Sequence, residues 1–558
     1  MAGVVAHDAA PTRRCLSTTD ARVGRVGKGG HGLSLRNGFL GAAGIVVGSS
    51  MVRAGIGIAK SVLAASYFGT SGPMDIYLVA ILLPDLVGRL SMTGTFNFVP
   101  LYAAERTHSP EAAWRAASKM VSYWLALLLC VLCVGAVLAP VLVSLIAPGF
   151  EGEQVQRAVA TCRVLFLMAA SVGAARVLAL PLIAERRFFA ATTSETLFQA
   201  ASTGFLVAFH SWGIDALAWG MVFGGFVQLL AVIIGLGEFR PRLRLDVDLR
   251  SKVVRRMFRL TLPTYIGNAG ARLNTLVNRG FASMLPAGGV SSLQYAYMLT
   301  ETPVSLLASP LNEALFPFLS SQYANDERKA QANLIRALLA IAMLFAPIAV
   351  GTYLLATPLV RCFFERGSFD ARSTELTASA LQIYAPSILA LALSGLLTSA
   401  FHARQNTTTP MKVGLIRIGV NAFLCFLLVA PLGHRGIALS NTTAESVKTV
   451  LLLVLLWRLL PREEAYLAMR PFLRLLPPLL LMTVVVHLLS VHTLTESGSW
   501  ILRSTTLAGV VLAGGFTYSA GLALFCREEI GFFWGMVRGG LVGLGSRFGR
   551  LASGRVGS

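Results

Sequence analysis

The chain has 558 residues, of which 55% are hydrophobic and only 13% are charged, and its mean hydropathy is +0.66. A soluble protein of this length carries far more charge, so the composition excludes an ordinary soluble domain and predicts many transmembrane helices. The formal net charge of +21 lies mostly in the two terminal segments and the short loops, where basic residues face an anionic leaflet, so we expect anionic membrane lipids and no nucleic acid as partners.

The chain begins with a polar, basic arm, residues 1–36, which has no signal-peptide cleavage site and which we expect to be disordered and cytoplasmic. About twenty apolar residues cross a bilayer as a helix. Fourteen stretches of this kind follow the arm and predict an all-α polytopic membrane protein. They lie at residues 40–68, 74–93, 121–147, 158–183, 193–210, 213–236, 260–285, 290–319, 333–355, 374–401, 413–430, 436–460, 472–491 and 500–525.

These spans divide the chain into two six-helix lobes and two additional C-terminal helices. The predicted segments are the N-lobe at 37–240, a basic cytoplasmic linker at 241–259, the C-lobe at 260–460, the last two spans at 461–526 and a basic tail at 527–558. Connections with few and with many basic residues alternate along the chain, and the positive-inside rule then places both termini in the cytoplasm. The loop "RCFFERGSFDAR" breaks this trend, because it is basic yet falls on the outer side.

The two lobes carry weak sequence similarity at an offset of 217–219 residues. A repeat of six spans enters the membrane in the same direction twice, as in transporters whose parallel halves rock about a site between them. The matched positions are Ala65-Ser66 with Ala282-Ser283, Pro84 with Pro303, Pro100 with Pro317, Pro140 with Pro358, and Phe150 with Phe369.

Each lobe begins with a span that carries two basic residues. Arg53 and Lys60 are seven residues apart, as are Arg272 and Arg279, and the two pairs are related by an offset of 219. Residues seven apart lie on one helix face, and a charge at the bilayer centre costs about 2.5–3.5 kcal/mol on insertion scales. We therefore expect all four side chains to face a shared aqueous cavity between the lobes and to bind an anionic cargo there.

Three further charged residues are assigned to the same cavity as substrate-binding candidates. Asp75 lies at the outer end of the second span, Arg89 lies on the same helix, and Glu301 lies at mid-depth in the eighth span. In the alternative interpretation each carboxylate only neutralises a nearby arginine, and Arg89 reaches the membrane surface from the span end. We interpret three other arginines in this second way, as side chains that extend to the surface: Arg163, Arg176 and Arg417.

No sequence motif predicts a catalytic or metal-binding centre. Cys130 and Cys133 form a CxxC, but neither a second pair nor histidines complete a zinc site. Asp246-Val247-Asp248 is a DxD of the kind that holds a divalent cation in a glycosyltransferase, yet it lies in a short loop and we interpret it as solvated. Because the chain has no HExxH, GxSxG or Walker A sequence, we expect neither catalysis nor ATP hydrolysis.

Five stretches between about residues 45 and 460 resemble a known family. They are "YFGTSGPMDIYLVAILLPDL", "FASMLPAGGVSSLQYAYMLTETP", "ALFPFLS", "FFERGSF" and "FHARQNTTTPMKV". Together they resemble the MurJ (MviN) family of lipid II flippases, within the multidrug/oligosaccharidyl-lipid/polysaccharide exporter superfamily.

The resemblance implies a flippase in the cytoplasmic (inner) membrane of a bacterium. Its cargo would be lipid II, an undecaprenyl-diphosphate-linked peptidoglycan precursor, moved from the inner to the outer leaflet by alternating access for cell-wall synthesis. The resemblance also implies that cavity arginines bind this cargo, that spans 13 and 14 form an apolar groove for its polyprenyl tail, and that the cell-wall synthesis machinery is a protein partner.

The chain departs from the family pattern at three places. Arg53 and Lys60 are seven residues apart where the family has two arginines six apart, Gly88-Arg89 replaces a basic pair, and the segment 295–299 lacks an arginine that some relatives have. We hypothesise that Arg272 or Arg279 supplies the missing charge.

These departures leave other functions open. The alternatives are a flippase for another polyprenyl-diphosphate-linked saccharide and a scaffold for envelope assembly that does not transport. A drug exporter of the same fold is disfavoured, because exporters of cationic drugs favour acidic cavities. We expect no bound cofactor. Transport would be coupled to the membrane potential or to a monovalent cation, for which Asn421 or Asn441 could form a site.

Overall fold

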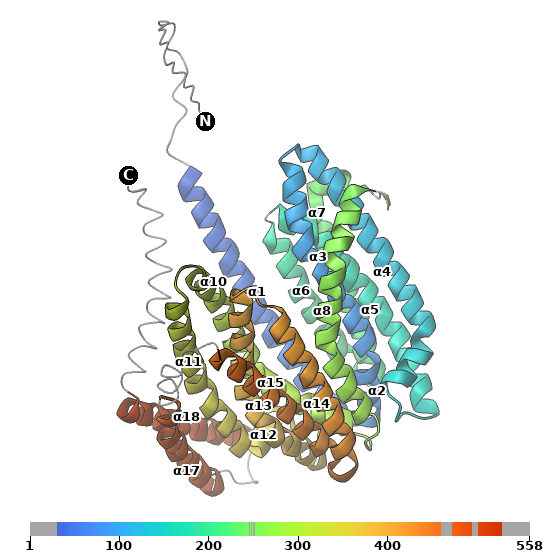
Figure 1. Ribbon diagram of the computed structural model, residues 1–558. Helices are drawn as coiled ribbons and strands as arrows, with labels where there is room; N and C mark the ends of the chain where they lie inside the picture. The colour runs from blue at the N-terminus through green and yellow to red at the C-terminus, as the bar shows by residue number, and fades with distance from the viewer. Residues whose placement is uncertain are drawn as a thin grey trace, which may run out of the picture.

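The structure is a computed structural model, and it describes residues 31–185, 187–244, 246, 248, 251–458, 471–493 and 500–526. This part of the chain is helical and contains no strand. Nine of its helices are long and apolar enough to cross a membrane. Helices α1, α6 and α8 and the two divided spans α2–α3 and α9–α10 are not among these nine, although they run beside them in the bundle (Figure 1).

The first six predicted spans correspond to helices α1 to α7. Their bounds are α1, His31–Phe68; α2, Gly72–Ala80; α3, Leu82–Arg106; α4, Pro110–Ile146; α5, Glu153–Ala184; α6, Phe188–Ala208; and α7, Ile214–Leu236. The second predicted span is divided between α2 and α3, which meet at Ile81, three residues before Pro84. Proline has no backbone N–H and its ring clashes with the preceding turn, so it accounts for a break at this point.

The next six predicted spans correspond to helices α8 to α15. Their bounds are α8, Lys252–Ala282; α9, Gly289–Pro303; α10, Ser309–Asn325; α11, Glu327–Leu354; α12, Ala356–Phe364; α13, Ala371–Ala403; α14, Thr408–Leu432; and α15, His434–Trp457. A π-helical turn, Val304–Ala308, joins α9 to α10 directly after Pro303. Each lobe therefore interrupts its second span within a few residues of the proline that the repeat matches, before Pro84 in the N-lobe and after Pro303 in the C-lobe. The last two spans are α17, Leu476–Thr493, and α18, Trp500–Phe525.

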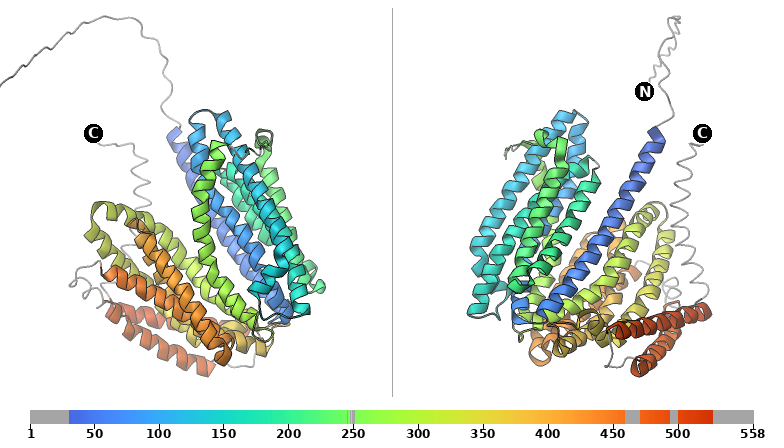
Figure 2. Two further views of the ribbon diagram at one scale, coloured as in Figure 1. Left: turned by 45° about the vertical axis from the view of Figure 1, so that its right-hand side comes forward. Right: turned by 180° about the vertical axis from the view of Figure 1, so that it is seen from behind.

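The two lobes converge at one end of the molecule and diverge at the other (Figures 1 and 2). We call the first the closed end; it comprises residues 66–75, 147–152, 283–291 and 364–373. We call the second the open end; it contains the starts of α4, α8 and α11. Helix α8 belongs to both lobes. Near its start Met257 accepts a hydrogen bond from Trp124 of α4 over 3.2 Å, and farther along Asn274 donates to Asn441 of α15 over 3.0 Å.

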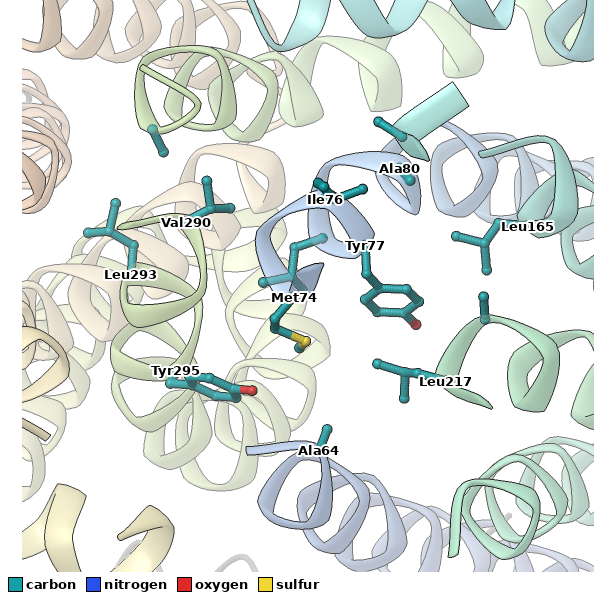
Figure 3. Close-up of a cluster of buried hydrophobic side chains, with 14 of the residues drawn as sticks. Ala64, Met74, Ile76, Tyr77, Ala80, Leu165, Leu217, Val290, Leu293 and Tyr295 are labelled. Carbon is teal, nitrogen blue, oxygen red and sulfur yellow. The ribbon is translucent and has the colours of Figure 1, made fainter. Parts of the chain in front are cut away.

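The largest apolar cluster lies at the closed end and contains residues of both lobes. Met74 and Tyr77 of α2 lie in this cluster with Leu293 and Tyr295 of α9 (Figure 3). Because lipid tails are as apolar as these side chains, the contact is stabilised by close packing rather than by transfer out of water. The cluster holds α2 and α9 together at this end.

Three features differ from the sequence prediction. Helix α1 begins at His31, so residues 31–36, which we expected to be disordered, extend the helix, since no proline interrupts them. Helix α8 begins at Lys252, within the predicted linker. The short helix α12 was not predicted at all. The predictions for residues 1–30, 459–470 and 527–558 concern segments outside the described residues.

Candidate functional site

The lobes meet at the closed end through two contacts that follow the repeat. Ser368 donates its backbone N–H to the carbonyl of Ser66 over 2.7 Å, and Gly149 donates its N–H to the hydroxyl of Ser283 over 3.1 Å. Ser66 and Ser283 are 217 residues apart and Gly149 and Ser368 are 219 apart. In both contacts the end of a lobe's first helix touches the matching loop of the other lobe.

Glycine permits this approach. A Cβ on Gly367 would lie 2.3 Å from the carbonyl oxygen of Ser66, and a Cβ on Gly149 would lie 2.4 Å from that of Ser283. Gly367 also has a φ of +59°, which glycine adopts without a steric penalty. The two lobes therefore touch backbone to backbone, with no room for a side chain between them.

Asp75 takes part in the same contact between the lobes. Its carboxylate accepts the backbone N–H groups of Gly288 and Ser291, each over 2.7 Å, and its side chain is buried. These N–H groups lie at the start of α9, where the helix dipole favours a negative charge. The hydroxyls of Thr70 and Ser373, 2.7 Å apart, add a further contact between the lobes. Asp75 thus joins α2 to α9 at the closed end.

A polar cavity of about 180 Å³ lies within the C-lobe, between α8, α9, α13, α14 and α15. Arg279 lines it and donates to the Val290 carbonyl over 3.4 Å and to the side-chain oxygen of Gln294. Arg417 lines it from α14. The described residues around this cavity include two arginines and no carboxylate; the other polar lining residues are Asn274, Thr275, Asn278, Gln294, Tyr297, Tyr384 and Asn441. The cavity therefore favours an anion with several oxygen atoms.

A buried ionic network lies beside this cavity. Glu445 of α15 is 1% exposed and contacts Arg417 over 2.5 Å and Lys448 over 3.0 Å. Ser394 of α13 donates to the same carboxylate over 2.7 Å. Two cations around one carboxylate leave an excess of one positive charge, and the pairing reduces the large penalty of burying each charge alone.

Both described basic residues of the first span contact partners within the N-lobe. Arg53 forms an ion pair with Glu195 of α6, which also lies 4.0 Å from Arg176. The Lys60 ammonium lies 3.3 Å from the Ser202 hydroxyl and 5.5 Å from the ring centroid of Phe198.

The predicted cavity residues are therefore distributed over the two lobes. Arg279 lines the C-lobe cavity, whereas Arg53 and Lys60 contact α6 and α7 of the N-lobe. Glu301 is exposed. Arg89 lies on α3 and Arg272 on α8, but their side chains lie outside the described part of the structure.

Five members of these networks were missed or interpreted differently from the sequence. Arg176 was expected to reach the membrane surface, yet it donates to the Gly88 carbonyl over 2.8 Å and lies 4.0 Å from Glu195. Arg417 was expected to reach the membrane surface, yet it pairs with Glu445. Glu445 and Lys448 were not singled out, although two opposite charges three residues apart inside an apolar span were a usable signal. Glu195 is a single carboxylate inside the fifth span, which was a weaker signal of the same buried-charge kind. Its partner Arg53 is 142 residues away, which no local pattern predicts.

An apolar groove of about 770 Å³ lies on the C-lobe, between α11, the start of α12, α17 and α18. Its lining is almost entirely aliphatic. The one phenol in it, Tyr518, donates its hydroxyl to the Met343 carbonyl over 3.0 Å and so presents no free donor to the groove. Such a surface suits a hydrocarbon chain.

The sequence profile described as "Lipid II flippase MurJ" matches residues 64–509 of the chain. The chain belongs to the MurJ family. A probable lipid II flippase MurJ of Rhizobium tropici is 29% identical over 495 residues, which cover 86% of this chain and 92% of the relative. The lipid II flippase MurJ of Burkholderia cenocepacia is 28% identical over 506 residues, which cover 88% and 96%.

A solved MurJ structure has the same fold. The lipid II flippase MurJ in its "inward closed conformation" superposes with a TM-score of 0.74 at 21% identity, covering 87% of this chain and 99% of that one. Two repeated lobes with two additional C-terminal helices are thus the architecture of a MurJ-family transporter, and the chain is a multi-pass membrane protein.

Proposed function

We propose that this chain is a flippase that moves lipid II from the inner to the outer leaflet of the bacterial cytoplasmic membrane by alternating access. The observation that carries the proposal is the closed end, where two repeat-related lobes meet through matched backbone contacts. Contacts of this kind can part and form again without breaking an ion pair. A molecule closed at one end, with lobes that diverge at the other, is one of the two states that alternating access requires.

The polar cavity of the C-lobe is the proposed site for the diphosphate. Arg279 extends its guanidinium there toward carbonyl and amide oxygens, and Arg417 adds a second guanidinium. The planar fork of arginine binds two phosphate oxygens at once, which an ammonium cannot do. The buried Glu445 holds Arg417 in place without cancelling the net positive charge of the network.

The apolar groove beside α17 and α18 is the proposed site for the polyprenyl tail. It is lined by side chains of helices that face lipid, and its volume of about 770 Å³ suits a segment of an isoprenoid chain. The saccharide-peptide part of the cargo would lie between the lobes.

The positive-inside rule places the open end and both termini on the cytoplasmic side. The structure then corresponds to a state that receives cargo from the inner leaflet. Asn441 accepts from Asn274 over 3.0 Å and from Arg417 over 3.5 Å, and Asn421 donates to Asn278 over 2.7 Å. Coupling to the membrane potential or to a monovalent cation at these amides stays a prediction, as does contact with the cell-wall synthesis machinery.

Depletion of the protein in its host tests the cargo. We expect lipid II to accumulate on the inner leaflet; accumulation of another polyprenyl-diphosphate saccharide instead would assign a different cargo, and no accumulation would favour a scaffold.

Reconstitution tests the site. Arg279→Gln should slow flipping of fluorescent lipid II in proteoliposomes by about tenfold or more, because one charge-assisted bidentate contact is lost. Arg279→Lys, which keeps the charge but loses the fork, should fall between Arg279→Gln and the wild type. Unchanged rates in both variants would contradict the proposed phosphate site.

A further inference from the structure

The short helix α12, Ala356–Phe364, has two different apolar faces. Ala356, Val360 and Phe364 are buried in the cluster at the closed end. The opposite face, formed by Leu359 and Cys362 and continued by Leu355 directly before the helix, packs into the separate cluster of α17 and α18. Residues three and four positions apart share a helix face, so each set forms a continuous stripe. One short helix therefore separates the groove from the closed end.

The groove side of α12 forms part of the wall of the proposed tail site. Leu355 and Leu359 line the apolar groove together with residues of α11, α17 and α18. Cys362 lies 3.4 Å from Ser504 of α18, and Trp500 donates its indole N–H to the Cys362 carbonyl over 3.1 Å. A chain that enters the groove thus contacts α12 directly.

The other side of α12 continues into the loop 365–370, which we call the gate loop. Phe364, directly before this loop, and Phe369 within it lie against Tyr295 of α9, with ring centroids 5.1 and 5.7 Å from it. Between them, Ser368 donates its N–H to the Ser66 carbonyl of α1 over 2.7 Å. The gate loop is therefore one half of the contact between the lobes.

Glu365, the first residue of the gate loop, connects α12 to α18 and α13. Its carboxylate lies 3.1 Å from Arg361 of α12 and 3.4 Å from Arg503 of α18, and it accepts the hydroxyl of Thr374 of α13 over 2.9 Å. This residue lies in the basic outer loop whose charge departs from the positive-inside pattern. Arg361 of this loop and Arg503 of α18 pair with this carboxylate, whereas Arg366 lies over the ring of Trp500.

We propose that α12 and Glu365 transmit occupancy of the apolar groove by a polyprenyl chain to the gate loop, so that filling of the groove changes the stability of the closed end. Glu365 and Arg503 are positioning residues in this arrangement and do not contact cargo. The proposal rests on the proposed function, because it takes the lipid tail as the occupant of the groove. A ligand changes a distant contact only if it binds more tightly to one of two conformational states than to the other.

Hydrogen exchange of the full-length protein in lipid nanodiscs tests the proposal. The probes are undecaprenyl diphosphate and farnesyl diphosphate, which share a headgroup and differ in tail length. With the long probe we expect slower exchange in the groove segments 343–359 and 511–523 and a changed rate in the gate loop and residues 66–70. With the short probe we expect no change in these segments.

Two variants test the connection between the groove and the gate loop without altering the groove itself. Glu365→Gln and Arg503→Gln should keep the protection of the groove by undecaprenyl diphosphate and lose the response of the gate loop. The exposed Glu151→Gln, on the N-lobe loop that matches the gate loop, should keep both responses.

The outcomes distinguish this proposal from the proposed function. Groove protection without a gate-loop response in the wild type, or a gate-loop response that survives in both variants, would overturn the link while the tail site stands. If the long probe leaves the groove of the wild type unprotected, the tail site of the proposed function fails, and the link fails with it.

Discussion

At the scale of single residues, Glu445 is the carboxylate that pairs with two cations of the C-lobe. It is 1% exposed and lies between Arg417 and Lys448. Removing one member of a buried ion pair leaves an uncompensated charge, which costs about 3–5 kcal/mol. We expect Glu445→Gln to lower the free energy of unfolding by an amount of this order, measured by thermal unfolding in detergent.

The control for this prediction is Glu313→Gln, at an exposed position of α10, which should leave the unfolding temperature unchanged. The double variant Glu445→Gln with Lys448→Met restores the original net charge of the network and should recover part of the loss. Equal unfolding temperatures for the wild type and Glu445→Gln would show that the network contributes nothing to stability.

Asp370, at the start of α13, should make the stability of the folded protein depend on pH. Its carboxylate accepts the backbone N–H of Ser373 over 2.8 Å, and this hydrogen bond holds the pKa of Asp370 below its ordinary value of 3.8. A carboxyl whose pKa is lower in the folded state stabilises the fold above its unfolded pKa, and this contribution is lost as the pH falls through the folded pKa.

We therefore expect the wild type to be more stable than Asp370→Asn at neutral pH and the difference to vanish below the pKa of the folded carboxyl. Thermal unfolding of both proteins at a series of acidic pH values measures this difference in stability. A difference that grows as the pH falls would have the wrong sign for this account.

At the scale of elements, the helices were predictable because about twenty apolar residues in succession have few alternatives in a membrane. The repeat also matched Pro84 with Pro303, and each of these prolines lies close to a break in the second span of its lobe. The direction of the basic side chains was not predictable, because it depends on which neighbour supplies a partner. Lys60 and Arg279 are equivalent in the repeat, yet Lys60 meets Ser202 and Arg279 meets Gln294.

Helix α12 shows a second limit of sequence analysis. Its nine residues are too few for a span, and its flanking charges resemble those of a solvent-exposed loop. Only the packing of α17 and α18 against one of its faces reveals that this segment is part of the core. Short amphipathic helices outside the spans gain their stability from tertiary contacts rather than from sequence propensity.

The contact of Gly149 with the C-lobe gives an element-scale prediction. A methyl group there would lie 2.4 Å from the Ser283 carbonyl oxygen and 2.5 Å from Met284 Cα, so the loop could not reach α8 without moving. We expect Gly149→Ala to slow flipping of lipid II in proteoliposomes, because the closed end must form in each cycle. Gly419→Ala is the matched control, since a Cβ there meets nothing within 4 Å. Equal rates in both variants would show that the close approach is dispensable.

At the scale of the whole molecule, the two lobes are held together in two ways. Backbone contacts and the carboxylate of Asp75 join them at the closed end, and α8 packs on both lobes along its length. The closed end joins the lobes through these polar contacts and through one apolar cluster, whereas α8 packs on both lobes along its length. Rocking of one lobe against the other would therefore break the closed end and bend or shift α8, which remains attached.

The most direct test of this account is to lock the closed end. The hydroxyl oxygens of Thr70 and Ser373 are 2.7 Å apart and come from different lobes, so Thr70→Cys with Ser373→Cys places two thiols within reach of a disulfide. Oxidation of this double variant should stop lipid II flipping in proteoliposomes, and reduction should restore it, while each single variant flips under both conditions. Flipping that continues at full rate with the disulfide formed would contradict alternating access through this end of the molecule.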